Sequence, residues 1–551
     1  KERGRVDVDR LSNIIARQKG VGQVTVVDTL CSDEGKKRLT EIAEESPCNR
    51  MVIGACQPYL YRPTLKNKVQ NAGFSPFFVA MRDLASIVHA QDALENGKDL
   101  TETAFHEIQV AIDHLKLQPP LTIEQRPINQ TVLVVGGGMA GMEAALFLAD
   151  QGVAVHLVEK ADTLGGYAGN LVHTTIDNRD LVAVAKKSAA SVTNHEKITV
   201  HLNCEITAGR GSFGSLETTI HDNHQDKNTF LHHGAAIIAT GGREGKIDEY
   251  CYTSCDGVVT QGELKEGLYK GTMDPGTMET VVMIQCAGSR KKEGRRYCSR
   301  ICCIGAVENA LAVKKQNPDA RVIVLYRDMT TPGFAEEYYT AARMAGVIFV
   351  SYDLDREPVV ELVDDKPRVT CFEPVLNCDM EITADLVVLS TGVDPEPANR
   401  ELGRIFDLPV DDNGFFTEAD PKWRPVEFRK NGFFLAGTAH SPMGIKEVIV
   451  QARAAAQKAL AAIFPETINQ ACITSTVHLS LCVRCQLCVE ICPYGARSYD
   501  LELDRIVVDG AACQACGMCA AACRNNAAEV TGWSDRQIMA VIDSKMELDA
   551  L

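Results

Sequence analysis

The stretch TVLVVGGGMAG at residues 131–141 decides the fold of the largest part of the chain. Its first five residues form a short apolar run rich in β-branched side chains, which predicts a buried parallel strand. A Gly-x-Gly-x-x-Gly motif follows, and the Ala-rich stretch 142–150 predicts a helix. A second strand is expected over residues 154–158, ending at Glu159. Strand, glycine loop, helix, strand and acid in this order indicate a dinucleotide-binding βαβ unit.

The glycines and the start of the helix have separate expected roles in that unit. Gly136 permits the tight turn, Gly138 lets the backbone approach a pyrophosphate, and Gly141 lets the helix pack close to the strand. The N–H groups at the helix N-terminus, at Met139 and Ala140, would face the phosphates. A purely structural glycine turn is the alternative, and the intact context of strands, helix and acid disfavours it.

The residues just after the second strand extend the candidate site. Glu159 stands where a carboxylate would bind the ribose hydroxyls. Lys160 is a neighbouring candidate contact, although a solvated side chain is the simpler interpretation. Leu164 is followed by Gly165 and Gly166, a segment that lies near the flavin in two-dinucleotide flavoproteins.

Three later motifs each place small residues after a strand. An apolar strand over 235–239 runs into Thr-Gly-Gly, the stretch 389–395 repeats this pattern, and 432–438 precedes a helix expected over 445–463. The series resembles the thioredoxin-reductase-like flavoproteins and so implies bound FAD. Where many of these carry an aspartate on the ribityl chain, this sequence has a threonine at 438. The candidate contacts that these motifs add are Thr240, Gly241, Gly392, Gly437 and Thr438.

A second βαβ module, for NAD(P)H, is expected inside the first, but its phosphate loop is replaced. The strand 281–285 and a helix reaching about Lys315 keep the fold, while cysteines and a basic stretch stand between them. Thiolates there would repel a diphosphate but suit a 4Fe-4S cluster. The expected ligands are Cys286, Cys298, Cys302 and Cys303. The alternatives are that some are buried apolar cysteines, or that one ligand comes from elsewhere.

Two cysteine runs near the C-terminus have the spacing of a bacterial two-cluster ferredoxin. Each run reads Cys-x-x-Cys-x-x-Cys-x-x-x-Cys, and a proline follows the first. In that arrangement the fourth cysteine of each run ligates the other cluster. A pair of structural zinc sites fits the short spacing and the proline less well. One expected ligand set is Cys482, Cys485, Cys488 and Cys523, and the other is Cys513, Cys516, Cys519 and Cys492.

Composition bounds the class of protein. A chain of 551 residues predicts three or four domains, and a net charge of −16 argues against nucleic acid as a partner. With no visible secretory signal, 21 Cys indicate metal ligands rather than disulfides, and so a reducing, anaerobic cytoplasm. No apolar run approaches the ~20 residues that span a bilayer. The sequence begins at Lys1, which leaves the true N-terminus open.

These motifs divide the chain into four expected parts. A small α/β domain occupies 1–115, and a thioredoxin-reductase-like FAD core occupies 130–465, with a cluster-bearing module inserted at about 245–390. An α+β ferredoxin domain with two 4Fe-4S clusters follows over 470–530, and a helical tail over 531–551. The expected fold class is therefore α/β, a two-dinucleotide FAD fold flanked by a small α/β domain and a ferredoxin domain.

The combination of motifs resembles the A-type (HdrA-like) subunit of heterodisulfide reductase. QCAGSR at 285–290 and YCSRICC at 297–303 carry the resemblance, together with the FAD motifs and the double ferredoxin. The segments 30–32 and 49–58 and the tail 532–538 agree with it. Larger members of that family insert a further ferredoxin domain into the flavin domain. A cysteine run is missing from that place here, so this chain resembles a short form without the insert.

The role of five further cysteines stays open in the sequence: Cys31, Cys48, Cys56, Cys251 and Cys255. The three N-terminal cysteines either hold another cluster, with a fourth ligand from the flavin domain, or lie in the core of a small domain. The other two are read as packed or exposed side chains, with cluster ligation as the alternative. The resemblance thus implies FAD and two to four 4Fe-4S clusters.

The resemblance implies an oxidoreductase subunit in which FAD exchanges electron pairs with single electrons carried by the clusters. Expected partners are HdrB- and HdrC-like iron–sulfur subunits and an electron-input protein such as a hydrogenase or formate dehydrogenase, with ferredoxin as a further candidate and a homodimer within the larger complex. Flavin-based electron bifurcation or confurcation is consistent with this family. The alternatives are a quinone-linked relay to a membrane partner, a stand-alone NAD(P)H-dependent ferredoxin-type oxidoreductase, and a scaffold with idle cofactors. No general acid or base is assigned.

Overall fold

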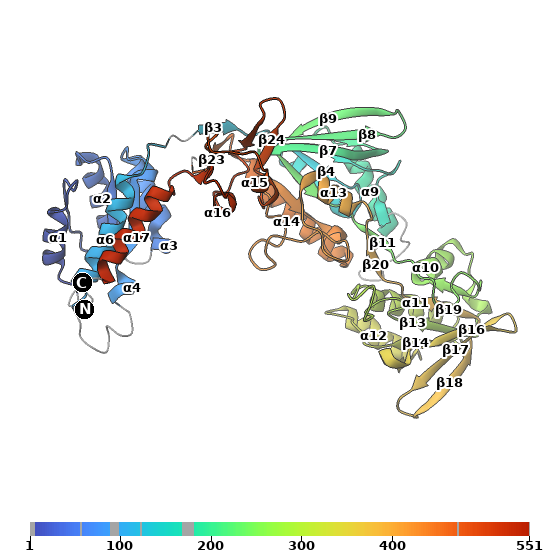
Figure 1. Ribbon diagram of the computed structural model, residues 1–551. Coiled ribbons are helices and arrows are strands. Elements are labelled where there is room, and N and C mark those ends of the chain that lie inside the picture. The colour runs from blue at the N-terminus through green and yellow to red at the C-terminus, as the bar shows by residue number, and fades with distance from the viewer. Residues whose placement is uncertain are drawn as a thin grey trace. The chain divides into compact units, whose positions relative to one another are not determined.

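The contacts of the computed structural model divide the chain into two compact units (Figure 1). One unit combines the chain up to residue 125 with the chain from residue 469, and the other spans 126–468. The structure describes residues 6–55, 58–88, 99–121, 124–167, 181–470 and 473–549.

The larger unit is built on a five-stranded parallel sheet that contains the predicted βαβ unit. Its strands, in sheet order, are β21 (Phe433–Leu435), β10 (Ala235–Ile238), β4 (Thr131–Val135), β5 (Ala154–Val158) and β6 (Ile198–His201). One face is covered by α7 (Met139–Asp150), α9 (Leu181–Thr193) and α14 (Ile445–Ile463). The other face packs on α13 (Asn399–Phe406) and an antiparallel sheet of β7 (Cys204–Ser212), β8 (Ser215–Asp222) and β9 (Lys227–His233).

The predicted bounds of these elements are confirmed with two shifts, the smaller being that β10 ends at Ile238, one residue before the predicted end. Strands β4 and β5 and helix α14 begin and end where the sequence predicts. Helix α7 begins at Met139, three residues early, because Gly138 is its N-cap and the last glycine of the motif lies inside the helix. The helix N-terminus therefore opens directly onto the glycine loop, as a phosphate-binding site requires.

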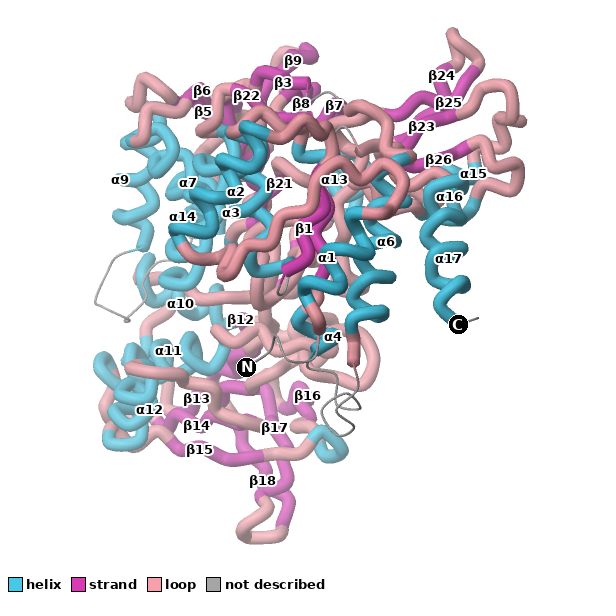
Figure 2. Tube along the Cα trace, turned by 90° about the vertical axis from the view of Figure 1, so that its left-hand side faces the viewer, coloured by secondary structure: helices cyan, strands magenta, loops and turns pink. Residues whose placement is uncertain are grey.

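A second parallel sheet forms the inserted module (Figure 2). Its order is β12 (Val258–Thr260), β19 (Leu386–Leu389), β13 (Thr280–Ile284), β14 (Arg321–Tyr326) and β15 (Ile348–Ser351). Helices α10 (Gln261–Lys270), α11 (Cys302–Gln316) and α12 (Ala335–Met344) cover one face. The other face packs on the antiparallel strands β16 (Val359–Val363), β17 (Lys366–Glu373) and β18 (Cys378–Thr383). The paired strands β11 (Gly242–Glu244) and β20 (Val393–Pro395) join this module to the first sheet.

The smaller unit contains an N-terminal α/β part and the cysteine-rich part. The former comprises α1 (Val8–Ala16), α2 (Asp33–Glu45), β1 (Met51–Ala55), α3 (Pro58–Asn71), β2 (Val79–Asp83), α4 (Ala85–Val88) and α6 (Thr101–Lys116). The latter comprises β23 (Ser475–Val477), α15 (Leu487–Glu490), β24 (Arg497–Asp500), β25 (Arg505–Val508), α16 (Met518–Ala522) and β26 (Ala528–Val530).

The C-terminal helix α17 (Asp535–Asp549) belongs to the N-terminal part by its contacts. It packs against α6, and the buried amide of Gln537 donates a 2.9 Å hydrogen bond to the side-chain oxygen of Gln118. The hydroxyl of Ser544 also donates to Asp113 of α6, at 3.1 Å. Within the described ranges, none of the helices combines the length and the apolar character needed to cross a bilayer.

Candidate cofactor sites

The first glycine loop has the geometry of a phosphate cradle. Gly136 has a φ of +107°, and a Cβ added there would lie 2.3 Å from the Ala239 carbonyl oxygen. A Cβ on Gly141 would lie 1.8 Å from the Gly136 oxygen, so these two positions admit only glycine. A Cβ on Gly138 would meet no atom of the chain within 4 Å. The space above Gly138 is thus kept free at the N-terminus of α7, where a diphosphate would sit.

The acidic residue after β5 is held beside this loop. The Gly137 N–H donates to the Glu159 carboxylate at 2.6 Å, and the Ala161 N–H donates to its other oxygen at 2.8 Å. Glu159 is therefore fixed at the edge of the glycine loop, and its contact with a ribose stays a prediction. Lys160 forms a 2.6 Å ion pair with Glu396, and its side chain is half exposed.

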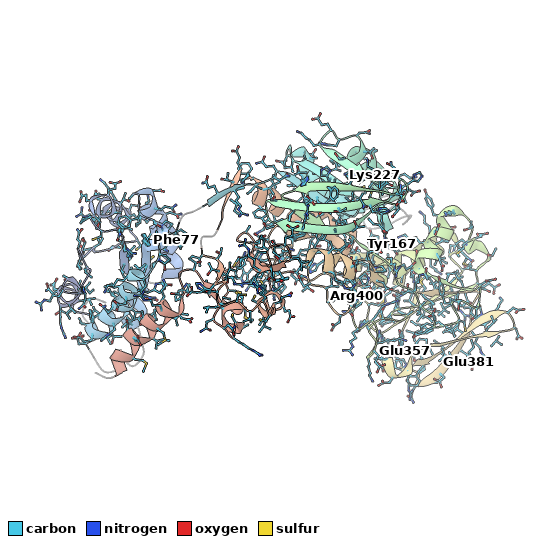
Figure 3. All side chains as sticks on the ribbon, turned by 45° about the horizontal axis from the view of Figure 1, so that its top comes forward. Phe77, Tyr167, Lys227, Glu357, Glu381 and Arg400 are labelled. Carbon is cyan, nitrogen blue, oxygen red and sulfur yellow. The ribbon has the colours of Figure 1, made fainter. Side chains whose placement is uncertain are left out.

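The segment after Glu159 returns to the glycine loop. Gly165 donates its N–H to the Gly137 carbonyl oxygen at 2.9 Å, and an added Cβ on Gly166 would lie 3.0 Å from the Cα of Gly138. Tyr167 follows (labelled in Figure 3). Burial raises the pKa of the Tyr167 phenol, and the charges of Glu244 and then Cys302 add to the rise.

The last motif also reaches the N-terminus of α7. A Cβ added to Gly437 would lie 2.7 Å from the Cβ of Ala140. The Gly437 N–H donates to Gln451 Oε1 at 2.7 Å, and the other atom of that amide, Nε2, lies 2.8 Å from His440 Nδ1. His440 is also fixed by Glu418, 2.8 Å from its Nε2. The sequence did not indicate Gln451 or Glu418, because only the fold brings them to this motif.

The two Thr-Gly motifs lie in different surroundings. Thr240 donates its hydroxyl to Asn399 at 2.7 Å, and a Cβ on Gly241 would lie 3.7 Å from the hydroxyl of Thr438. Gly392 lies against the cysteine loop, since an added Cβ would be 2.6 Å from the hydroxyl of Ser299. Of the predicted flavin contacts, Gly392 is thus the one placed beside the cysteines.

The loop between β13 and α11 differs from the first glycine loop in length and chemistry. Residues 136–138 alone connect β4 to α7, whereas residues 285–301 connect β13 to α11. Cys286 follows β13 with a φ of +57°, and Cys302 and Cys303 form the first turn of α11. Cysteine side chains thus take the place that a dinucleotide phosphate occupies in a nucleotide-binding module.

The four cysteines of this loop interact with one another. Burial raises the pKa of the Cys302 thiol, and Cys303, Cys286 and Cys298 raise it further. Burial also raises the pKa of Cys303, to about 11. Of the four, Cys303 is buried, Cys286 and Cys302 are partly buried, and Cys298 is exposed. Thiolates this close repel one another, and a bound cationic metal centre would stabilise them.

Buried polar atoms without partners surround these cysteines. Within the described part of the chain, both amide atoms of Gln285 and the hydroxyls of Ser289 and Thr391 are buried and form no hydrogen bond. An unsatisfied buried polar group costs about 1–3 kcal/mol. The inorganic and cysteine sulfurs of an iron–sulfur cluster accept hydrogen bonds. The residues around the cysteine loop therefore fit such a cluster.

Basic residues of the same loop are tied to the protein. Arg295 forms a 2.7 Å ion pair with Asp394 and donates to the Thr391 carbonyl oxygen at 2.5 Å. Arg290 pairs with Asp328 at 2.6 Å and lies 3.9 Å from the Cys286 sulfur. This basic stretch thus anchors the cysteine loop to the strands around it.

The eight C-terminal cysteines line two separate cavities. One cavity, of about 390 Å³, is lined by Cys482, Cys485, Cys488 and Cys523. The other, of about 20 Å³, is lined by Cys492, Cys513, Cys516 and Cys519. These are the two ligand sets expected from the exchange of the fourth cysteines. In the second site Ser475 contacts two of the thiols, Cys513 through its N–H at 3.3 Å and Cys519 through its hydroxyl at 3.1 Å.

The two cysteine runs also repeat in backbone conformation. Arg484 and Gln486 of the first run have positive φ, and so do Ala515 and Gly517 at the matching places of the second. The fourth cysteine of each run accepts a hydrogen bond from the N–H four residues later, at 3.3 Å for Cys492 and 3.2 Å for Cys523. Such turns aim successive sulfurs into one space. Within the described ranges, no three Cys, His, Asp or Glu side chains are placed to hold a single metal ion.

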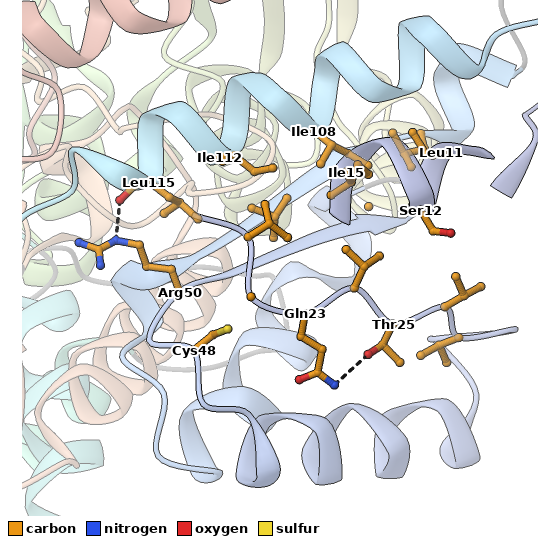
Figure 4. Close-up of a pocket in the computed structure, with 18 of the residues that line it drawn as sticks. Leu11, Ser12, Ile15, Gln23, Thr25, Cys48, Arg50, Ile108, Ile112 and Leu115 are labelled. Atoms are coloured by element: carbon orange, nitrogen blue, oxygen red, sulfur yellow. Dashed lines mark hydrogen bonds between the residues drawn. The ribbon is translucent and has the colours of Figure 1, made fainter. Parts of the chain in front are cut away.

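The remaining cysteines have separate surroundings. Cys48 lines a cavity of about 910 Å³ in the N-terminal part, walled by apolar residues of α1 and α6 (Figure 4). Cys31 lies in the turn before Ser32, the N-cap of α2, and Cys56 lies outside the described residues. Cys255 is buried in the apolar core of the inserted module, and Cys251 packs beside it.

Comparison with known proteins places these sites in context. A family model described as pyridine nucleotide-disulphide oxidoreductase matches residues 130–459, and a 4Fe-4S dicluster domain model matches residues 475–524. These matches support FAD and 4Fe-4S clusters as cofactors and confirm the predicted fold class.

Several known proteins are similar over most of the chain. An A-type iron-sulfur subunit of the CoB–CoM heterodisulfide reductase of Methanopyrus kandleri is 29% identical, covering 89% of this chain and 87% of that protein. The corresponding protein of Methanocaldococcus jannaschii is 28% identical, covering 90% and 89%. The thioredoxin reductase structure of Lactococcus lactis aligns with 61% of this chain and 99% of that one, at 17% identity and a TM-score of 0.43. The predicted resemblance to the A-type subunit of heterodisulfide reductase is confirmed.

Proposed function

Because the chain belongs to the pyridine nucleotide-disulphide oxidoreductase family and carries a 4Fe-4S dicluster domain, we propose that it distributes electrons between FAD and iron–sulfur clusters. It would act as the A-type subunit of a heterodisulfide-reductase-like complex. FAD, when bound, supplies the exchange of an electron pair for single electrons. The chain would hold the FAD and provide the path by which electrons leave it. It would also exclude NAD(P)H from the second nucleotide module.

The observation that carries this proposal is that residues of the predicted flavin site lie next to the cysteine loop. Tyr167 follows the glycine pair that contacts the first glycine loop. It is partly buried, and the nearby Cys302 contributes to the rise of its pKa. Arg300 ties the cysteine loop to Glu447, at the start of α14, with a 2.6 Å ion pair. A cluster on the cysteine loop would therefore be the flavin's immediate neighbour.

The cluster ligands remain part of the proposal. We assign one cluster to Cys286, Cys298, Cys302 and Cys303, and two to the C-terminal cysteines in the sets that line the two cavities. The orphaned amide of Gln285 and the hydroxyls of Ser289 and Thr391 would donate to sulfurs of the first cluster. These donors would raise its reduction potential, because they stabilise the more negative reduced state.

The partners are proposed on the names of the relatives. The similar proteins are A-type subunits of CoB–CoM heterodisulfide reductases, and one, from Methanococcus maripaludis, belongs to an enzyme described as H(2)/formate:CoB-CoM heterodisulfide,ferredoxin reductase. We infer B- and C-type iron–sulfur subunits, an electron-input protein, and a cytoplasmic complex that contains two copies of this chain. Purification of the native complex under anaerobic conditions, with identification of the proteins that accompany the chain, tests this assignment. Recovery with only a transmembrane haem protein would favour the quinone-linked alternative.

Electron bifurcation is the more specific proposal for the flavin. It requires that the flavin release its second electron at a lower potential than its first, so that both electrons are taken up in one step during equilibrium titration. A potentiometric titration of the FAD absorbance under anaerobic conditions tests this. A single two-electron step supports bifurcation, and two well-separated one-electron steps contradict it.

A further inference from the structure

A buried arginine lies between the two C-terminal cysteine sites. Arg497 is the first residue of β24 and is only 4% exposed. Its Nη2 donates to the hydroxyl of Ser475 and, at 3.0 Å, to the carbonyl oxygen of Thr476. Its Nε and Nη1 are buried and have no partner among the described residues. Burial of a cation with unused donors is unfavourable unless a negative group takes them up.

Arg497 borders the cysteines of both sites. Arg497 lines the cavity of Cys482, Cys485, Cys488 and Cys523 and also that of the other four cysteines. Burial raises the pKa of the Cys488 thiol, and the nearby Arg497 guanidinium opposes that rise. On the other side, Ser475, which accepts from Arg497, lies 3.1 Å from the Cys519 sulfur. One guanidinium thus reaches one site directly and the other through a single hydroxyl.

The internal repeat has no arginine at the matching place of its other half. The two cysteine runs are offset by 31 positions, since Cys482 matches Cys513 and Cys492 matches Cys523. By that offset Arg497 matches Ala528, and Ser475 matches Ile506, both buried and apolar. The strand pairing keeps the same relation, because Ser475 pairs with Val530 and Ile506 with Tyr499. The polar pair is therefore present in one half only of a nearly symmetric domain.

We propose that Arg497 is a shared counter-charge that favours the reduced state of both C-terminal clusters. The inference rests on the ligand sets proposed above. A cluster with four thiolates takes up one electron and no proton, so its negative charge grows by one. A fixed cation and N–H donors in a buried site stabilise the more negative state, and the reduction potential rises. An arginine at this place is suited to the role because it stays charged at every accessible pH.

The test is a potentiometric titration of the intact chain, followed by EPR of the reduced clusters. Arg497→Met removes the charge and the donors, Arg497→Gln keeps donors without charge, and Arg497→Lys keeps the charge. Arg505→Met is the matched control, since it removes an exposed arginine from the neighbouring strand β25. At a fixed solution potential, Arg497→Met should lower the reduced-to-oxidised ratio of at least one C-terminal cluster tenfold or more, a shift of about 59 mV. The other cluster should move in the same direction, Arg497→Lys should recover much of the shift, and Arg505→Met should cause little.

The outcomes separate this proposal from the ligand assignment. A wild-type chain without the eight C-terminal irons would overturn the assignment itself. If the Arg497→Met and Arg497→Gln variants keep their iron and have wild-type reduction potentials, the counter-charge proposal is overturned and the ligand assignment stands. Loss of iron from both variants, restored by Arg497→Lys, would support a need for the charge. Loss of iron from all three would instead reduce Arg497 to a structural role.

Discussion

At the scale of single residues, two glycines three positions apart have opposite purposes. Gly138 has an extended backbone that any residue could adopt, and the space beside it is empty of protein. At Gly141, an added Cβ would lie only 1.8 Å from the Gly136 carbonyl oxygen. Gly138 therefore leaves space for a ligand, and Gly141 allows α7 to pack closely on the glycine loop.

Substitution of these glycines should separate binding from stability. Gly138→Ala should weaken FAD binding at least tenfold, about 1.4 kcal/mol, because the methyl group occupies the space for the pyrophosphate. Its flavin-free thermal midpoint should stay close to that of wild type. Gly141→Ala should destabilise the fold by about 1–3 kcal/mol or more through overpacking. FAD titration and thermal unfolding of both variants check this, and equal loss of stability in both would contradict it.

Residue-level prediction is possible where a residue type is required by its own backbone or spacing, and is not possible where the role of a residue comes from a distant partner. The glycines and cysteines were recognisable by spacing. Arg497 belongs to no such motif, because its place beside both cysteine sites arises only when the two halves of the repeat fold together. The contacts of Gln451 and Glu418 with the last glycine motif could not be predicted for the same reason.

At the scale of elements, a buried histidine in the sheet of β7, β8 and β9 should make the stability of the fold depend on pH. His233 is fully buried, with Nε2 beside the Thr218 hydroxyl at 2.8 Å and Nδ1 beside the Ala235 oxygen at 3.0 Å. Burial lowers its pKa to about 4. Unfolded histidine titrates near 6.5, so between about pH 6.5 and 4 the unfolded state binds more protons than the folded state. Stability should therefore fall as the pH falls through this window.

The contribution of His233 to this loss is at most roughly 3 kcal/mol. The His233→Gln variant should be less stable than wild type near pH 7 but should lose less stability between pH 6.5 and 4. His232→Gln is the control, because that side chain is exposed on the same strand. Denaturant unfolding at several pH values gives the slopes. Equal slopes in wild type and His233→Gln would exclude this origin of the pH dependence.

The elements of the two nucleotide-type modules were predicted for a simple physical reason. Fully buried parallel strands such as β4 and β13 are short continuous apolar runs, and these are legible in a sequence. The antiparallel strands β7 to β9 and β16 to β18 were not predicted. The outer strands β7 and β18 have few buried positions, so their pairing depends on the neighbouring strands and on the sheets that they cover.

At the scale of the whole molecule, the loss of the second phosphate loop should isolate the flavin from NAD(P)H. Residues 285–301 place thiols where the N–H groups of a glycine loop would bind a diphosphate. NADH or NADPH in large excess should leave the FAD of the isolated chain oxidised, while a chemical reductant should bleach it. The measurement is stopped-flow absorbance under anaerobic conditions. Flavin reduction by either nucleotide at catalytic rates would refute this expectation.

The central claim is that flavin and cysteine loop form one electron path, and iron analysis tests it most directly. Anaerobically purified chain should contain about twelve iron and twelve sulfide per FAD, from three four-iron clusters. The Cys302→Ser/Cys303→Ser double variant should contain about eight, with FAD and the EPR signals of the C-terminal pair retained. Sixteen in the wild type would add a cluster at the N-terminal cysteines without harming the account. About eight iron in the wild type, unchanged by the double variant, would contradict it, because the cysteine loop would then hold no cluster.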